Sequence, residues 1–406
     1  MENLKQQRLR YNLPVLVCLA LVVLLLFLPT GYEDAVIYKG ADRCAARVLA
    51  VNNERVVDTG LIRSGEQTCT VELLGGRFRG RTTEGFNLLS GSLEQDKIFQ
   101  VGDRAQVVVS YEGDRILSTN MIDHYRLDKE AVLAVCFAAF LILFAGRTGV
   151  RAILSFMLTV LVLWKVLVPL YLNGWNPIWT GLFITLLLTV LIIALVYGFD
   201  RRCAAATSGA AIGLLVTALL GVVCTGQFQI HGAVMAYSES LLYSGYQDLN
   251  LTKIFMASIF IGSSGAVMDL AVDICSAVNE VVHKKPGIGW REATRSGLNV
   301  GRAAMGTMTT TLLLAYSGGY IALLMVFMAQ GTPIYNILNY KYVAAEIIDT
   351  VVGSFGLVSV APFTALTSGF LLTRGRKPSL SRRRFNNRCR PEWTRVRGLL
   401  PRRAGR

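Results

Sequence analysis

Long apolar runs divide most of the chain into segments of membrane-crossing length, separated by short polar stretches. Each run has few or no charged residues, and about 20 apolar residues are what a helix needs to cross a bilayer. The pattern predicts about eight transmembrane helices. They are expected at residues 13–29, 132–145, 152–172, 178–197, 204–225, 254–283, 305–329 and 343–372.

The stretch between the first two runs, residues 31–128, has a different pattern, with short segments of strand composition and partial alternation. These segments are residues 43–51, 66–74, 104–111 and 115–122. A Gly-Gly pair after the second segment predicts a tight hairpin, and residues 112–114 read as a turn. About five strands in a segment of this length predict a small antiparallel barrel or curled sheet.

The expected fold is therefore an α-helical polytopic membrane protein with a small extracytoplasmic β-domain between the first and second transmembrane helices. Residues 1–30 would form a cytoplasmic leader and the first helix, and residues 31–128 the barrel-like domain. Residues 129–373 would form a seven-helix transmembrane domain, with a less apolar extracytoplasmic segment at 231–251 lying at the membrane interface. Residues 374–406 would be a disordered, Arg-rich cytoplasmic tail.

Composition and charge agree with a membrane location and orient the chain. The sequence is 53% hydrophobic and only 17% charged, whereas about 25% is usual in soluble domains. Most of the net charge of +14 lies in the tail, where thirteen Lys and Arg residues accompany one acid, Glu392. Basic loops and both termini are expected in the cytoplasm. The tail would attract anionic lipid, and nothing in it specifies a nucleic-acid partner.

Two acids, Asp269 and Asp273, fall inside the sixth apolar run. A carboxylate in a bilayer costs roughly 2.5 to more than 10 kcal/mol, so it needs a partner or a pathway. Positions 269, 273, 276 and 280 follow a helical repeat and share one face. Asp269 would lie about 22 Å from the outer end of its helix, while Asn279 and Glu280 would reach the cytoplasmic headgroup layer.

The seventh run begins with a cluster of threonines at the same expected depth. We expect Asp269 and Asp273 to face this cluster, with Arg302 as a counter-charge. The alternative is a buried hydrogen-bond network that only sets helix register. The cluster consists of Thr307, Thr309, Thr310 and Thr311.

The sequence contains a few other candidate functional residues. Glu346 and Asp349, in the eighth run, would form an outer vestibule or simply be solvated at the interface. An extracytoplasmic location would allow a disulfide between Cys44 and Cys69. The spacing of Cys and His predicts no metal site and no cofactor, and the sequence lacks P-loop, HExxH and GxSxG motifs, so no catalytic residue and no enzyme is predicted.

Three segments make the sequence resemble the YibE/F-like bacterial membrane protein family. They are GSSGAVMDLAVDICSAVNEV at residues 262–281, NVGRAAMGTMTTTLLLAYSGGY at 299–320 and EIIDTVVGSFGLVSVAPFTAL at 346–366. The resemblance covers nearly the whole chain except the tail. It implies a polytopic fold in the bacterial cell membrane, and it implies no substrate or catalytic residue.

Two functions are consistent with these features. The first is a secondary transporter or permease for a small solute or ion, in which Asp269 and Asp273 bind a cation, a proton or a basic group. The second is a membrane-anchored sensor or assembly factor whose β-domain binds an envelope ligand. Either could work with a related membrane protein or as a homo-oligomer.

Overall fold

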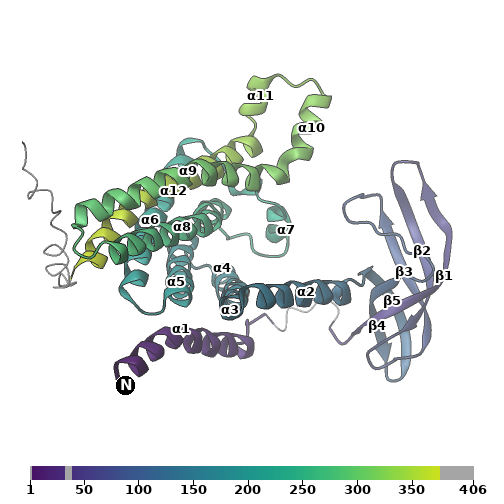
Figure 1. The fold of residues 1–406 in the computed structure, drawn as a ribbon. Coiled ribbons are helices and arrows are strands. Elements are labelled where there is room, and N and C mark those ends of the chain that lie inside the picture. The colour runs from purple at the N-terminus through teal and green to yellow at the C-terminus, as the bar shows by residue number, and fades with distance from the viewer. Residues whose placement is uncertain (1, 33–38, 375–406) are drawn as a thin grey trace, which may run out of the picture. The chain divides into compact units, whose positions relative to one another are not determined.

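The computed structural model describes residues 2–32 and 39–374, and these form two compact units (Figure 1). One unit is Pro29–Ile153, which contains the β-domain and the helix that follows it. The other combines Met1–Leu28 with the chain from Leu154 onward. Apart from Arg374, the predicted tail lies outside the described residues.

Five strands close into a small barrel, as the alternating segments predict. The strands are β1 Asp42–Asp58, β2 Arg63–Leu73, β3 Thr82–Ser90, β4 Arg104–Glu112 and β5 Arg115–His124. Their order around the barrel is β1-β2-β3-β5-β4, and β1 closes it by pairing antiparallel with β4. Every second residue of β2 from Gln67 to Leu73 is buried, because successive side chains of a strand point to opposite faces.

Two local expectations about the barrel are wrong. The connection after β2 is not a tight hairpin, because β2 ends at Leu73 and β3 begins only at Thr82. Cys44 and Cys69 are free thiols. Cys69 pairs with Val51 across β1 and β2, so Cys44 lies seven residues along β1 from the Cys69 partner. At about 3.3 Å per residue that is about 23 Å along the strand, far beyond the reach of a disulfide.

The helix α2, Leu127–Ala145, follows the barrel after two residues and has no buried side chain. The remaining elements belong to the helical part of the chain (Figure 1). They are α1 Glu2–Phe27, α3 Arg147–Val162, the π-helical turn η1 Leu163–Leu167, α4 Val168–Leu172, α5 Pro177–Tyr197, α6 Arg201–Gln227, η2 Gly232–Val234, α7 Ser238–Tyr243, α8 Leu251–Lys284, α9 Trp290–Ser317, η3 Gly318–Tyr320, α10 Ile321–Ala329, α11 Ile334–Leu338 and α12 Lys341–Thr373.

Six helical segments in the described part of the chain are long and apolar enough to cross a membrane. The protein is therefore a polytopic helical membrane protein. The segments are Arg147–Leu172, Pro177–Tyr197, Arg201–Gln227, Leu251–Lys284, Trp290–Ala329 and Lys341–Thr373. The two further expected spans are a shorter apolar stretch, Asn12–Phe27, and α2, whose first turn contains three charged residues. The segment at 231–251 contains η2 and α7 and ends at the first residue of α8.

Helix α8 lies at the centre of the helical unit and packs against α5, α6, α9 and α12. Helices α6 and α12 approach each other through small residues. A Cβ on Gly209 would collide with Thr364, one on Gly213 with Val360, and one on Gly356 with the hydroxyl of Thr217. Glycine at these positions lets the two backbones approach closely, as in other membrane helix pairs.

Candidate functional site

One stripe of α8 remains exposed although the rest of the helix is enclosed by its four neighbours. The exposed positions are spaced four, three, four, four, three and four residues apart, so they form a single face. They are Ser258, Gly262, Gly265, Asp269, Asp273, Ser276 and Glu280. We call this set the acid stripe. Asn279 is half-buried and lies beside the stripe rather than on it.

The α5 side of the acid stripe is closed by Tyr197. Its hydroxyl donates a hydrogen bond of 2.6 Å to the carbonyl oxygen of Val272 and lies 2.6 Å from the hydroxyl of Ser276. The guanidinium of Arg202 lies over the Tyr197 ring, 5.2 Å from its centroid, and forms an ion pair of 3.3 Å with Asp200. A positive charge therefore lies near the Ser276 end of the stripe.

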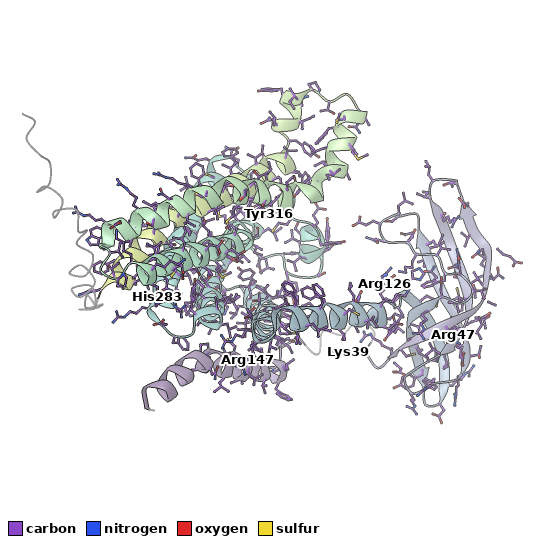
Figure 2. All side chains as sticks on the ribbon, in the orientation of Figure 1. Lys39, Arg47, Arg126, Arg147, His283 and Tyr316 are labelled. Carbon is purple, nitrogen blue, oxygen red and sulfur yellow. The ribbon has the colours of Figure 1, made fainter. Side chains whose placement is uncertain are left out.

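The α9 side of the stripe is defined by an antiparallel register between α8 and α9. Gly297 lies beside Val278, and Gly301 lies beside Ile274. At the other end of the contact, a Cβ on Gly262 would lie 2.7 Å from the phenol oxygen of Tyr316. Figure 2 marks Tyr316 toward the C-terminal end of α9 and His283 at the C-terminal end of α8.

This register brings part of the predicted threonine cluster to the stripe. Seven residues are about two helical turns, so Thr309 lies on the same side of α9 as Tyr316 and at the level of Asp269. Another seven residues lead to Arg302, at the level of Ser276. The spacing puts Thr307, Thr310 and Thr311 on other sides of α9.

The predicted bonds between the acids and this cluster are not formed. In the described part of the chain, no hydrogen bond or ion pair joins Asp269 or Asp273 to the threonines or to Arg302. The Thr309 hydroxyl instead donates to the carbonyl oxygen of Met305, at 2.9 Å, and the other three hydroxyls also bond to carbonyls of their own helix. Such back-bonding satisfies a threonine without any partner on another helix.

The outer acids occupy a separate, more buried place on α12. One carboxylate oxygen of Glu346 and one of Asp349 are buried without a hydrogen-bond partner. Tyr316 lies against Gly262, the position on the acid stripe seven residues, or about 10 Å, before Asp269.

These acids and their neighbours lie inside a segment that matches a known family. The sequence matches the YibE/F-like protein family over residues 133–374, which is more than half of the chain. The chain belongs to the YibE/F-like family. No curated protein and no solved structure matches it. The matched range excludes the barrel, so the family likeness is narrower than the near-complete coverage expected from the motifs.

Sequence reasoning missed three residues of this YibE/F-like site. Tyr197, Arg202 and Tyr316 border the acid stripe, and none is an acid or belongs to the threonine cluster. Tyr316 could have been found from its seven-residue spacing from Thr309 and Arg302, which predicts a shared face. The position of Tyr197 depends on how α5 packs on α8, and no local pattern indicates it. In the ranges that the structure describes, no group of three or more His, Cys, Asp or Glu side chains is arranged to hold a metal ion.

Proposed function

We propose that this protein is a secondary transporter for a small cation, with the proton as the simplest case, and that the acid stripe is its pathway. The observation that carries the proposal is the exposure of Asp269 and Asp273 on a helix that packs against four neighbouring helices. Acids that faced only lipid would carry a large free-energy cost. Acids that face a water-accessible or protein-lined path would bind and release cations.

The flanking residues support a path that is lined by several polar groups. The phenol of Tyr316 lies against Gly262, and the stripe then continues through Asp269 and Asp273. Tyr197 and Ser276 contribute hydroxyls at the far end. Hydroxyls and carboxylates can pass a proton or coordinate a small cation. The proposal includes no enzymatic step.

We further propose eight membrane spans, with α1 and α2 added to the six long segments, in a bacterial cell membrane. The start of α6 and the end of α12 lie together, because the Arg201 guanidinium donates to the Arg374 carbonyl oxygen at 2.6 Å. The end of α8 carries Lys284 and Lys285. This concentration of basic residues supports a cytoplasmic location for that end and for both termini, with the barrel on the opposite side.

A partner is expected to cover the acid stripe, either a second copy of this chain or a related membrane protein. Segment Trp290–Ala329, which borders the stripe, has only 11% of its most apolar window buried, against 50% for Lys341–Thr373. A transmembrane segment with so little cover and with Arg302 exposed is suited to packing against another protein. The Arg-rich tail would bind anionic lipid.

Proton flux in liposomes tests the transport proposal. The full chain is reconstituted with a trapped pH-sensitive dye, and a potassium diffusion potential drives proton entry. We expect Asp269→Asn and Asp273→Asn each to lower the flux by about tenfold or more, because an amide cannot carry the charge. Asp248→Asn, in the exposed loop before α8, is the matched control and should leave the flux unchanged.

Two results would contradict the transport proposal. One is unaltered flux in both Asp→Asn variants. The other is a wild-type protein that dissipates no imposed proton, sodium or potassium gradient.

A second candidate function, ligand sensing or assembly through the barrel, is favoured by a hollow on the outer face of β1, β2 and β3. It has a volume of about 490 Å³ and is lined mainly by polar side chains, among them Asn52, Arg55, Glu66 and Glu84, with Phe86 at its edge. In some five-stranded barrels this face binds oligosaccharides. This function predicts that deletion of residues 31–128 abolishes activity, while the two Asp→Asn changes affect only stability.

A further inference from the structure

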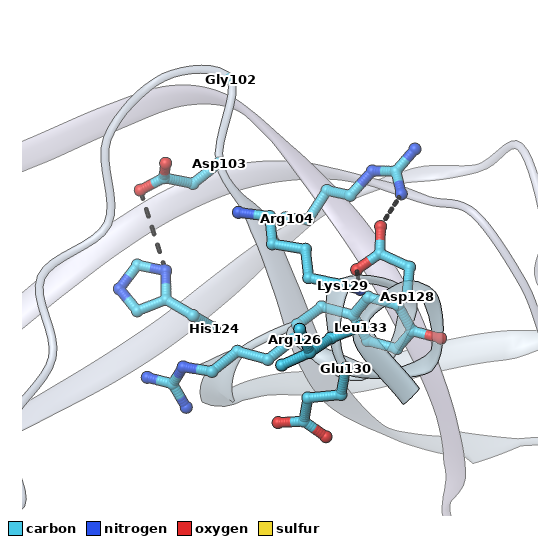
Figure 3. Close-up of a pocket in the computed structure, with 10 residues that line it drawn as sticks. Gly102, Asp103, Arg104, His124, Arg126, Asp128, Lys129, Glu130 and Leu133 are labelled. Atoms are coloured by element: carbon cyan, nitrogen blue, oxygen red, sulfur yellow. Dashed lines mark hydrogen bonds and ion pairs between the residues drawn. The ribbon is translucent and has the colours of Figure 1, made fainter. Parts of the chain in front are cut away.

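A second hollow lies at the root of the barrel, where β5 passes into α2 (Figure 3). Its volume is about 850 Å³. The strands contribute Arg104 and His124, the turn before β4 contributes Asp103, and the first turns of α2 contribute Lys129, Glu130 and Leu133. Only two residues separate His124, the last residue of β5, from the start of α2. The hollow is thus attached directly to the start of this helix.

Most of the charges around the hollow are already paired. Arg104 forms an ion pair of 2.7 Å with Asp128, and the His124 imidazole lies 4.0 Å from the Asp103 carboxylate. Arg126 bonds Asp123 at 2.9 Å. These pairs hold the wall of the hollow in place and leave it close to neutral in charge.

Two adjacent side chains of opposite charge remain available. Lys129 and Glu130 are exposed, and over residues 2–32 and 39–374 neither side chain takes part in an ion pair or hydrogen bond. Figure 3 labels both among the residues that line the hollow. A ligand that carries one negative and one positive group would match this pair, whereas a polyanion would be repelled by Glu130 and by Asp103.

The hollow is also continuous with an apolar surface. Leu133 lines it, and α2 has no charged residue after Glu130 and no buried residue along its length. A ligand with a zwitterionic head and apolar tails could therefore place its head in the hollow and its tails along α2.

We propose that this hollow binds the head group of a phospholipid that carries a phosphate and a primary ammonium, as in phosphatidylethanolamine. The phosphate accepts hydrogen bonds from Lys129, with the Arg104 and Arg126 guanidiniums nearby, and the ammonium donates to the Glu130 carboxylate. The proposal rests on the membrane location of α2 given above, and it is independent of transport.

Native mass spectrometry of the full chain in detergent tests this site. The protein is titrated with phosphatidylethanolamine, phosphatidylcholine and phosphatidylglycerol of identical acyl chains, and with glycerophosphoethanolamine, which has the head group without the tails. We expect the ethanolamine lipid to bind most tightly, because choline has no N–H to donate to Glu130. The head group alone should bind more weakly, since it lacks the contact with α2.

Single variants test separately what the Lys129 and Glu130 charges contribute to lipid binding. Lys129→Ala and Glu130→Gln should each weaken binding of the ethanolamine lipid by about tenfold, the size of one charge-assisted hydrogen bond. Lys39→Ala and Glu112→Gln, which remove exposed charges elsewhere in the same unit, should not. A preference for phosphatidylglycerol that Glu130→Gln leaves unchanged would overturn the zwitterion proposal. Equal binding in all variants, or no lipid bound at all, would overturn the site itself.

Measuring both lipid binding and proton flux in the same variants keeps the lipid site distinct from the transport pathway. If lipid binding is lost in Lys129→Ala while proton flux through the same variant is unchanged, the hollow is a lipid site without a role in the pathway. Loss of flux in Asp269→Asn with lipid binding retained would show that the two sites act separately.

Discussion

The hydroxyl oxygens of Tyr197 and Ser276 lie 2.6 Å apart, so the end of α5 is bonded to the acid stripe of α8. Tyr197 also bonds the carbonyl oxygen of Val272, one turn earlier on α8. Asp273 lies between these two contact points in the sequence. Tyr197 therefore holds the stretch of α8 in which the second acid is exposed.

Removal of the Tyr197 hydroxyl should weaken the packing of α5 against α8. Tyr197→Phe keeps the ring and its contact with Arg202 but loses both hydrogen bonds, so we expect a loss of about 1 kcal/mol in the free energy of unfolding. The melting temperature of the full chain in detergent measures it. Tyr243→Phe, in the exposed helix α7, is the control, and an equal effect in both variants would mean that the bond contributes nothing.

The contact between Gly262 and Tyr316 can be tested by adding a methyl group at position 262. In Gly262→Ala the new methyl group would lie 2.7 Å from the Tyr316 oxygen, so Tyr316 must move and the variant should be less stable than its control. In Gly265→Ala nothing lies within 4 Å of the new methyl group, and a gain of about 0.5–1 kcal/mol is expected from helix propensity.

Tyr316→Phe, combined with Gly262→Ala, should restore the stability that the single glycine variant loses. Melting temperatures of the three variants and the Gly265→Ala control decide the matter. Equal stability of the two single glycine variants would mean that Tyr316 does not lie against Gly262.

The hydrogen bonds to Asp96 predict that the local stability of the barrel depends on pH. The backbone N–H of Ser90, together with the Ser90 hydroxyl and the N–H groups of Gly91 and Ser92, lowers the pKa of this carboxyl. A lowered folded-state pKa stabilises the fold above the unfolded value of about 3.9, and this stabilisation is lost as the pH falls through the folded-state pKa.

Hydrogen-exchange protection of the Ser90, Gly91 and Ser92 amides, corrected for intrinsic exchange, measures this effect. Protection should decrease below about pH 4 in the wild-type protein. It should be low and independent of pH in Asp96→Asn. Glu112→Gln should behave as wild type, and a flat profile in the wild-type protein would contradict the role of Asp96.

The thiol of Cys69 should react slowly. Burial, with a smaller contribution from the Asp103 charge, raises the pKa of Cys69 to about 11, so at pH 8 only about one molecule in a thousand carries the thiolate that reacts. Burial also raises the pKa of Cys44, which is less buried. We expect iodoacetamide to modify Cys44 before Cys69, as read by peptide mass spectrometry. A Cys44–Cys69 linked peptide would contradict the structure.

The fold could be predicted from the sequence where the secondary structure of a residue is determined by its neighbours along the chain. Apolar runs long enough to span a bilayer give helices in any packing, and alternation gave the barrel because one face of each strand must be buried. The face shared by Asp269, Asp273, Ser276 and Glu280 follows from helical spacing alone. Each of these features depends on residues close together in the sequence.

The remainder of the site depends on how distant elements pack. The threonines at 307–311 share a depth with Asp269, but depth does not determine which side of α9 faces the stripe, and a threonine in a helix can bond its own backbone. The separation of Cys44 from Cys69 depends on strand register, which the composition of the two strands does not reveal. The position of Tyr316 against Gly262 follows from the pairing of α8 with α9.

The glycines between α6 and α12 limit how such a protein could alternate between two states. Backbones that touch through Gly209, Gly213 and Gly356 cannot slide or tilt without collision, so α6 and α12 should move together as one rigid frame. Helix α9 packs on the same frame, because its Gly297 lies against Ala365 and its Gly301 against Ala361 of α12, so the moving part is expected to be α10. If access to Asp269 alternates between the two membrane faces, the hinge is expected at the Gly318-Gly319 break between these two helices.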